Sequence, residues 1–117
     1  MGRSSAHGIW PFVPLQPLLT HCRAIVHSGA HGTNALALAA GIPSVIRPCL
    51  FDQRWHAERQ QKLGTGIWAR RPRDLDSAIG HAVRDEQLAE TAREFAARLA
   101  PEDGTARACD AIEATLR

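Results

Sequence analysis

The sequence predicts an α/β fold in which a small parallel sheet with flanking helices is followed by a helical C-terminal third. In the first two thirds of the chain, short apolar runs beside glycine or proline alternate with longer helical stretches. Strands that alternate with helices pair in parallel through crossover helices. From residue 72 onward the pattern is helical only, so the sheet is expected in the first part of the chain.

The predicted strands are three short apolar segments. Each is too short to form a helix and lies close to a glycine or a proline, which is typical of buried strands bounded by turns. They are residues 24–26, 44–46 and, with a weaker pattern, 66–69.

Helices are predicted in the remaining stretches, and their ends coincide with residues that stop helices. The segment 34–40 consists mostly of good helix formers and ends at Gly41, and the segment 53–63 ends at Gly64. Pro72 suits a first helical turn. A short helical segment ends near His21, and the further helices cover residues 72–84, 86–99 and 102–116. We expect this C-terminal part to consist of amphipathic helices that serve packing.

The composition fits a single globular domain. The chain has 117 residues, of which 44% are hydrophobic and 22% are charged. The net charge of +2 is too small, and the basic residues are too scattered, to indicate nucleic-acid binding. Residues 1–8 are polar and small, and we expect them to be a disordered lead before a domain of residues 9–117.

Cysteine usage and hydropathy indicate a cytoplasmic protein. The three cysteines form no Cys-x-x-Cys pair, and their odd number disfavours a disulfide framework, so a reducing compartment fits. No apolar stretch reaches the roughly 18 residues that a membrane helix needs. Residues 1–8 lack the apolar core of a signal peptide. We therefore expect no transmembrane segment.

The segment from His27 to Thr33 is the first candidate binding element. A predicted strand runs into a turn of small residues and then into a helix, which presents free backbone N–H groups and the positive end of the helix dipole. Phosphate is a natural ligand there. Gly29 and Gly32 allow a tight turn and a close approach, and Ser28 can add a hydrogen-bond donor. The alternative is an ordinary strand, turn and helix with Thr33 as a cap.

The second candidate is the loop that follows Pro48. Ligands in open parallel sheets bind beyond the carboxyl ends of the strands, so this loop should lie beside the turn after Val26. The loop contains Asp52 and Gln53, whose carboxylate and amide suit the neighbouring hydroxyl groups of a sugar. The alternative is that Asp52 merely caps the helix that begins near Gln53.

A third candidate lies upstream, at Phe12 and Val13. The ring of Phe12 is suited to stacking on a base, and exposed backbone at Val13 is suited to reading the edge of that base. The alternative is a hydrophobic entry into a turn.

In this order, the motifs resemble the donor-binding signature of nucleotide-sugar-dependent glycosyltransferases of the GT-B fold. Phe-Val-Pro is followed by Leu-Leu-x-His-Cys, Val-His-x-Gly-x-x-Gly-Thr, Ala-Gly-Ile-Pro, Asp-Gln and Gly-x-Gly, within residues 11–70. The pattern is most similar to that of bacterial macrolide and antibiotic glycosyltransferases, and is also similar to that of plant secondary-product enzymes. It implies the C-terminal half of a GT-B fold, with a partial Rossmann-like sheet.

The resemblance implies a role for each candidate. The turn would bind the donor diphosphate, the Asp-Gln pair would bind the donor sugar, and the upstream aromatic residue with its neighbour would bind the base. In that order, the residues are His27, Ser28, Gly29, Gly32 and Thr33; Asp52 and Gln53; and Phe12 and Val13. The resemblance implies no metal and no cofactor other than the nucleotide-sugar substrate.

The chain also departs from the family pattern. Bacterial relatives often have a second histidine where this chain has Ser28 and a glycine where it has Ala30, and His31 stands where relatives are usually small. The acidic residue that binds ribose in plant enzymes would fall at Ala35. A GT-B enzyme has an N-terminal domain that binds the acceptor and carries the catalytic base, and this chain shows no such domain and lacks the first strands of the C-terminal one.

No catalytic residue is therefore assigned. We expect His21, His56 and His81 to be surface or packing residues. A metal site built from Cys22 and the histidines of the turn is disfavoured, because Gly29 argues against one helix presenting both histidines and no fourth ligand is apparent.

Two functions remain open. The first is a glycosyltransferase donor-binding domain that transfers a hexose from a UDP- or dTDP-sugar to a small lipophilic acceptor when it is joined to an acceptor domain, on the same chain or on another one. The second is a noncatalytic nucleotide-sugar-binding or assembly module, or a truncated gene remnant.

Overall fold

The sheet consists of three parallel strands in the order β1-β2-β3. A computed structural model describes residues 7–117. The strands are β1 (Ile25–His27), β2 (Ser44–Ile46) and β3 (Gly66–Trp68), and their register aligns Val26 with Val45 and Val45 with Ile67. The predicted parallel α/β arrangement is confirmed, although β1 begins one residue later than expected. Residues 1–6 of the predicted disordered lead lie outside the described residues, and His7 and Gly8 form no helix or strand.

The helices match the predicted ones closely, with shifted starts. They are α1 (Leu15–Leu19), α2 (His31–Ala40), α3 (Gln53–Leu63), α4 (Leu75–Arg84), α5 (Glu86–Leu99) and α6 (Gly104–Thr115). Helix α2 begins three residues earlier than the predicted start at Asn34, because the turn before it is shorter than expected. The predicted helix at Pro72 opens as a separate 3-10 turn, η1 (Pro72–Asp74), before α4 begins.

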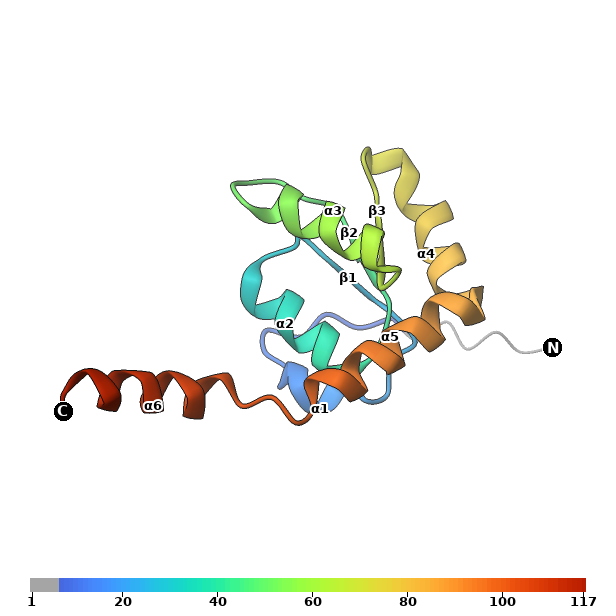
Figure 1. Ribbon diagram of the computed structural model, residues 1–117. Coiled ribbons are helices and arrows are strands. Elements are labelled where there is room, and N and C mark those ends of the chain that lie inside the picture. Colours follow the sequence, from blue (N-terminus) through green and yellow to red (C-terminus); the bar gives the residue numbers. More distant parts are fainter. Residues whose placement is uncertain (1–6) are drawn as a thin grey trace.

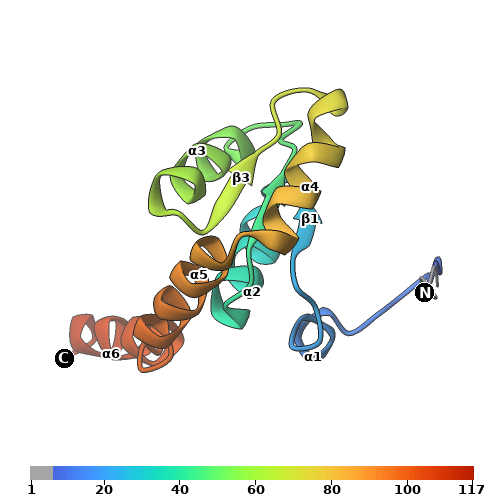
Figure 2. The same cartoon turned by 90° about the vertical axis from the view of Figure 1, so that its right-hand side faces the viewer.

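Helices cover both faces of the sheet. Helix α3 packs beside β3 and helix α2 beside β1, while α4 contacts β2 and β3. Figure 2 shows α3 and α4 on opposite sides of β3. All three residues of the central strand β2 are buried, as expected for a parallel strand covered on both faces.

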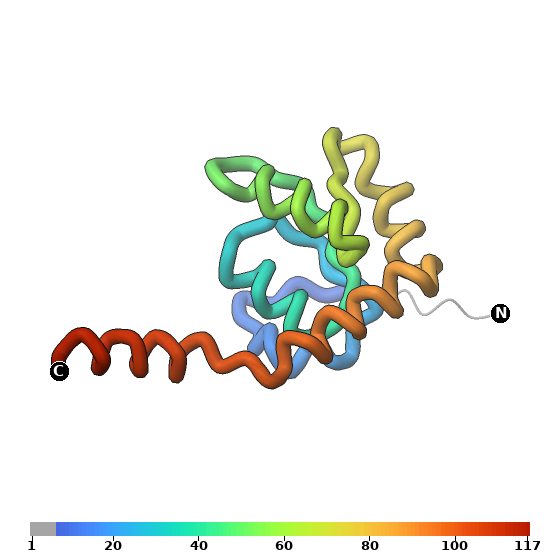
Figure 3. Tube along the Cα trace, in the orientation of Figure 1, coloured from blue at the N-terminus to red at the C-terminus, as the bar shows by residue number. Residues whose placement is uncertain are grey.

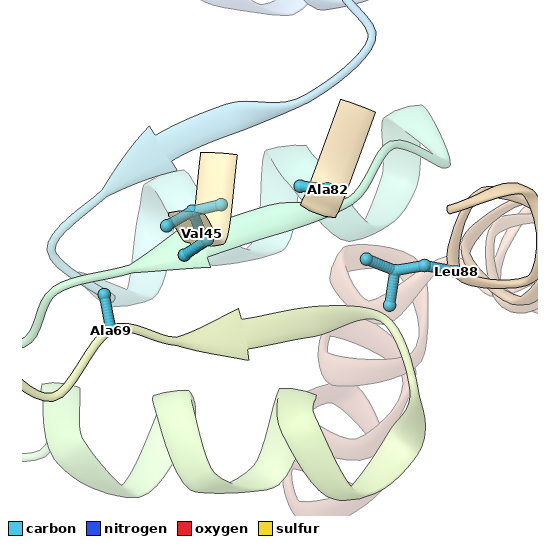
Figure 4. Close-up of a cluster of buried hydrophobic side chains, with 5 residues drawn as sticks. Val45, Ala69, Ala82 and Leu88 are labelled. Atoms are coloured by element: carbon cyan, nitrogen blue, oxygen red, sulfur yellow. The ribbon is translucent and has the colours of Figure 1, made fainter. Parts of the chain in front are cut away.

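The core between β2, α4 and α5 is built mainly from small side chains. Val45 packs in one cluster with alanines and with Leu88, which lies at the start of α5 (Figure 4). The alanines of the cluster are Ala69, Ala78 and Ala82. Small side chains let α4 approach the sheet closely, and they leave little apolar area to stabilise the domain.

A buried polar cluster fixes α2 against α3. Gln60 of α3 donates a hydrogen bond from its side-chain amide to the carbonyl oxygen of the Asn34 side chain in α2. The Thr65 hydroxyl donates to Oε1 of Gln60 at 3.1 Å. All three residues are buried, and an unpaired polar group at such a position costs about 1 to 3 kcal/mol. The cluster therefore orients the two helices whose first turns border the candidate site.

Helix α6 extends away from the rest of the molecule. Figures 1 and 3 show it as an arm beyond α5, and the chain measures 65 × 32 × 27 Å overall. Every residue from 101 to 117 is exposed. The expectation that all of the C-terminal part serves packing is therefore wrong for α6, because within the described chain no element lies against its apolar side.

Candidate functional site

The first loop, between β1 and α2, is shaped by His27 and Gly29. The backbone N–H of Gly29 donates to Nδ1 of His27 at 2.9 Å, and Nε2 of His27 lies 3.0 Å from the Ser44 hydroxyl. Gly29 has a φ of +91°, a conformation that other L-residues rarely adopt. A Cβ atom there would also lie 2.9 Å from the backbone oxygen of Gln53. Glycine is thus required both by the backbone conformation and by the lack of space.

These contacts define the state of the His27 ring. Since Nδ1 accepts a hydrogen bond, it carries no proton, and we assign the proton to Nε2, which donates to Ser44. Burial lowers the pKa of His27 below its ordinary value, because a charged ring would be poorly solvated there. His27 is predicted to contact a diphosphate, and in this structure its Nδ1 holds the turn while its Nε2 ties the ring to Ser44 of β2.

The first turn of α2 leaves backbone donors without helical partners. The first helical hydrogen bond runs from the N–H of Asn34 to the oxygen of Ala30, so the N–H groups of residues 31–33 precede it. Ala30 occupies the N-cap position, and no side chain caps the helix. The alternative that Thr33 is the cap is therefore wrong, because Thr33 lies inside the helix. A Cβ atom on Gly32 would meet nothing within 4 Å, so there is open space beside these donors.

The second loop, between β2 and α3, is held by Gln53. Its Oε1 atom accepts hydrogen bonds from the backbone N–H groups of Cys49 and Leu50, each at 2.9 Å. Of the groups on the Gln53 side chain, the NH₂ makes no described hydrogen bond, so its donors are the part that remains for a sugar hydroxyl. Within the same loop, Phe51 has a φ of +50° and its side chain is 93% exposed.

Asp52 is the N-cap residue of α3 by position, but its side chain caps nothing. The carboxylate accepts no hydrogen bond from the first turn of the helix, so the alternative of a simple cap is wrong. Oδ2 of Asp52 lies instead 3.4 Å from Nε2 of His56, one turn further along α3. The Asp52 side chain is 68% exposed and the His56 side chain 12% exposed. The carboxylate is thus open to solvent on one side and supported by an imidazole on the other.

The two loops meet at the carboxyl edge of the sheet, as the sequence predicted. The two loops touch where Gly29 of the first loop lies against the backbone of Gln53 at the end of the second loop. The ring of His31, the first residue of α2, lies 5.7 Å from the ring of His56 in the first turn of α3. The structure therefore brings the predicted diphosphate residues beside the predicted sugar residues.

Phe12 and Val13 are not brought to this edge by any described hydrogen bond or ring contact. Phe12 is 82% exposed, and Val13 lies just before α1. Helix α1 packs against α2, where Gln16 and Thr20 border a small pocket with Ala39 and Ala40 at the C-terminal end of α2. The role of Phe12 and Val13 in base binding stays a prediction.

Sequence reasoning missed His56 as a residue of the site. It was expected at the surface or in packing, whereas its ring contacts Asp52 and the rings of His31 and Trp55. The available signal was the spacing of four residues between Asp52 and His56, which places both on one side of a helix. Trp55 itself is exposed.

Two absences concern the described residues alone. Residues 7–117 contain no group of three His, Cys, Asp or Glu side chains that could hold a metal ion. None of the helices in this part of the chain is long and apolar enough to cross a membrane.

Comparison with known proteins decides the family. The family model described as erythromycin biosynthesis protein CIII-like, C-terminal domain, matches residues 8–113. The chain belongs to this family. The family resemblance seen in the sequence, a C-terminal domain of GT-B glycosyltransferases, is therefore confirmed.

The relatives of this chain include fungal enzymes. A sterol 3-beta-glucosyltransferase of Neosartorya fischeri is 34% identical over 87% of this chain, which corresponds to 8% of that protein. The sterol 3-beta-glucosyltransferase of Cryptococcus neoformans is 38% identical over 76% of this chain and 6% of its own length. The chain thus spans less than a tenth of the length of these relatives.

Solved structures of bacterial glycosyltransferases share the fold. The glycotransferase of kitacinnamycin matches with a TM-score of 0.80 and 29% identity. The match covers 91% of this chain and 28% of the glycotransferase chain. The Streptomyces sp. SF2575 glycosyltransferase SsfS6, complexed with thymidine diphosphate, has a TM-score of 0.69 and 29% identity, over 76% of this chain and 24% of its own. The chain spans about a quarter of these structures.

Proposed function

We propose that this chain is the part of a glycosyltransferase that binds the donor, a nucleoside diphosphate carrying a hexose. The proposal is carried by two features that lie at the same edge of the sheet. One is the set of three backbone N–H groups, at residues 31–33 of α2, that make no described hydrogen bond, and the other is the exposed carboxylate of Asp52. Backbone donors at a helix N-terminus suit a diphosphate, and a carboxylate suits sugar hydroxyl groups.

The same geometry supports a role in the chemical step. When the bond between sugar and diphosphate breaks, negative charge grows on the departing diphosphate. Fixed N–H donors at residues 31–33 would stabilise this charge without reorganising, which is the main way in which such donors accelerate a reaction. The base that deprotonates the acceptor hydroxyl would come from an acceptor domain, as the resemblance to GT-B enzymes implies.

The comparisons support a thymidine diphosphate sugar as the donor, and a UDP-sugar stays the alternative that the sequence resemblance implies. Two related structures, SsfS6 and VinC, are complexes with thymidine diphosphate, and they are 29% and 31% identical to this chain. The curated relatives act on sterols by name, which supports a small lipophilic acceptor for the joined enzyme. The three free cysteines of the described chain support a reducing, cytoplasmic location.

The test is calorimetric titration of the chain with dTDP, UDP and GDP, compared with the Gly32→Val variant. Because a Cβ at Gly32 meets no protein atom within 4 Å, the variant should keep its fold while its side chain blocks the space beside the N–H groups. We expect binding of dTDP or UDP to weaken at least about tenfold, or about 1.4 kcal/mol.

The matched control is Gly104→Val, at the start of the exposed helix α6, where a Cβ also meets nothing. It should leave the affinity unchanged. A folded wild-type chain that binds none of the three nucleotides would overturn the donor-site proposal and favour an assembly module without a nucleotide site or a truncated gene remnant.

A further inference from the structure

The ring of His56 lies on α3 between the two loops of the candidate site. Its Nε2 atom is 3.4 Å from Oδ2 of Asp52, its ring centroid is 5.7 Å from that of His31, and Trp55 meets it edge-on at 5.2 Å. Only 12% of its side chain is exposed. A polar side chain held this closely has few alternative orientations, so its contact with Asp52 is fixed by packing.

Asp52, by contrast, has no other described anchor. Its carboxylate caps no backbone group of α3, and the His56 ring is its one described side-chain contact. An aspartate that is 68% exposed is free to change rotamer unless a neighbour holds it. The orientation of the carboxylate toward a ligand therefore depends on His56.

We propose that His56 is a positioning residue for the donor sugar: it orients the Asp52 carboxylate, and the tilted contact of its ring with that of His31 places the carboxylate relative to the diphosphate turn. This inference rests on the proposed function and adds the residue that determines sugar affinity. His56 itself touches neither sugar nor diphosphate, so its effect appears only in the contribution that the sugar makes to binding.

The experiment compares two affinities for each variant, those for dTDP-glucose and for dTDP, by calorimetric titration, with UDP-glucose and UDP as the second pair of probes. In His56→Ala, the ratio of the dissociation constant of the nucleotide sugar to that of the free nucleotide should rise roughly threefold to tenfold, as for the loss of one oriented hydrogen bond. The affinity for the free nucleotide should stay within about twofold of the wild type.

Three further variants separate positioning from general damage. His56→Gln keeps a side-chain N–H donor and should restore the wild-type ratio. Asp52→Ala should raise the ratio as His56→Ala does, and the double variant should raise it no further, because both changes remove one coupled contact. His81→Ala breaks a pair of the same spacing away from the site, that of His81 on α4 with Asp85, the N-cap residue of α5, at 2.9 Å, and should change neither affinity.

The possible failures are distinguishable. If His56→Ala weakens both ligands equally, or if its effect adds to that of Asp52→Ala, the positioning role is overturned while the donor site stands. If the folded wild-type chain binds neither nucleotide nor nucleotide sugar, the proposed function itself fails, and this inference fails with it.

Discussion

The two loops at the carboxyl edge of the sheet each contain a residue with a positive φ, for opposite reasons. In the first loop, Gly29 adopts +91° because its backbone lies against Gln53 and leaves no space for a side chain. In the second loop, Phe51 adopts +50° although it is a bulky residue, and its side chain stands almost fully in solvent. The first loop is thus closed by packing, and the second is strained and open.

The first loop therefore fixes the position of the backbone before α2, whereas the second loop exposes side chains that can contact a ligand. In the first loop, the His27 ring accepts a hydrogen bond from the N–H of Gly29 and bonds the hydroxyl of Ser44, so the turn before α2 is tied to the neighbouring strand. In the second loop, Gln53 anchors the backbone, the Phe51 side chain stands in solvent, and the exposed Asp52 carboxylate has His56 as its described contact. Rigid support beneath exposed groups is the arrangement that a binding edge needs.

The largest effect that tests this contrast is expected for Gly29→Ala. The change adds a Cβ atom 2.9 Å from the backbone oxygen of Gln53 and forces alanine into a left-handed conformation. We expect a loss of about 3 kcal/mol in the free energy of unfolding, the sum of conformational strain and overpacking. Urea denaturation followed by circular dichroism measures it.

The matched change is Gly32→Ala, only three residues away, where a Cβ meets no neighbour. It should stabilise the chain by up to about 1 kcal/mol, since alanine favours the helix. Equal losses at Gly29 and Gly32 would mean that the first loop is not closed by the contact with Gln53.

A smaller effect of opposite sign is expected for Phe51→Gly. Glycine relieves about 1 to 2 kcal/mol of left-handed strain and loses about 0.5 to 1 kcal/mol through the extra freedom of the unfolded chain. Because the Phe51 ring makes little contact, the net result should be a stabilisation of about 0.5 to 1 kcal/mol in the same unfolding experiment.

Phe12→Gly supplies the comparison for Phe51, since Phe12 is also exposed but has no positive φ. It should leave the stability unchanged or lower it slightly. A destabilised Phe51→Gly variant would show that the exposed ring contributes to the fold and that the second loop is less open than described.

The smallest expected effect is a pH dependence of the stability of the chain, which arises from His27 in the first loop. The pKa of His27 in the folded chain lies below the ordinary value because the ring is buried, so between the two values the unfolded chain binds a proton that the folded chain does not. The resulting stability is present above about pH 6.5 and is lost as the pH falls through the folded-state pKa. Protonation of Nδ1 would also break its bond to Gly29.

The measurement is urea unfolding at about pH 7.5 and about pH 5.5, for the wild type and for His27→Asn. Asparagine offers an oxygen to the N–H of Gly29 but does not titrate in this range. The wild type should therefore lose more stability than the variant on acidification. Identical losses would remove His27 as the source of the pH dependence.

Local sequence signals predicted most of the elements and both loops of the site. Helix ends at Gly41 and Gly64 follow from their left-handed conformations, which glycine adopts without strain. The strand β2 follows from a short apolar run bounded by prolines. That the two loops lie beside each other follows from parallel pairing alone, because the carboxyl ends of parallel strands lie at the same edge of the sheet.

Contacts between distant segments were not predictable in this way. The pairing of Gln60 with Asn34 joins residues on two helices, and the absence of packing around α6 depends on what surrounds it. The contact between the rings of His31 and His56 likewise joins α2 to α3. The Asp52 carboxylate, by contrast, meets His56 four residues further along the same helix, a spacing that the sequence itself contains.

The sequence by itself therefore determined the element order, the parallel sheet, the family and the identity of the loops, since these depend on backbone preferences and short-range spacing. The tertiary structure alone decided that His27 bonds Ser44 of the next strand, that Gly29 lies against Gln53 and must lack a side chain, and that the rings of His31 and His56 come together. Those facts depend on which atoms of separate segments come within contact distance, and that is fixed only when the helices pack on the sheet.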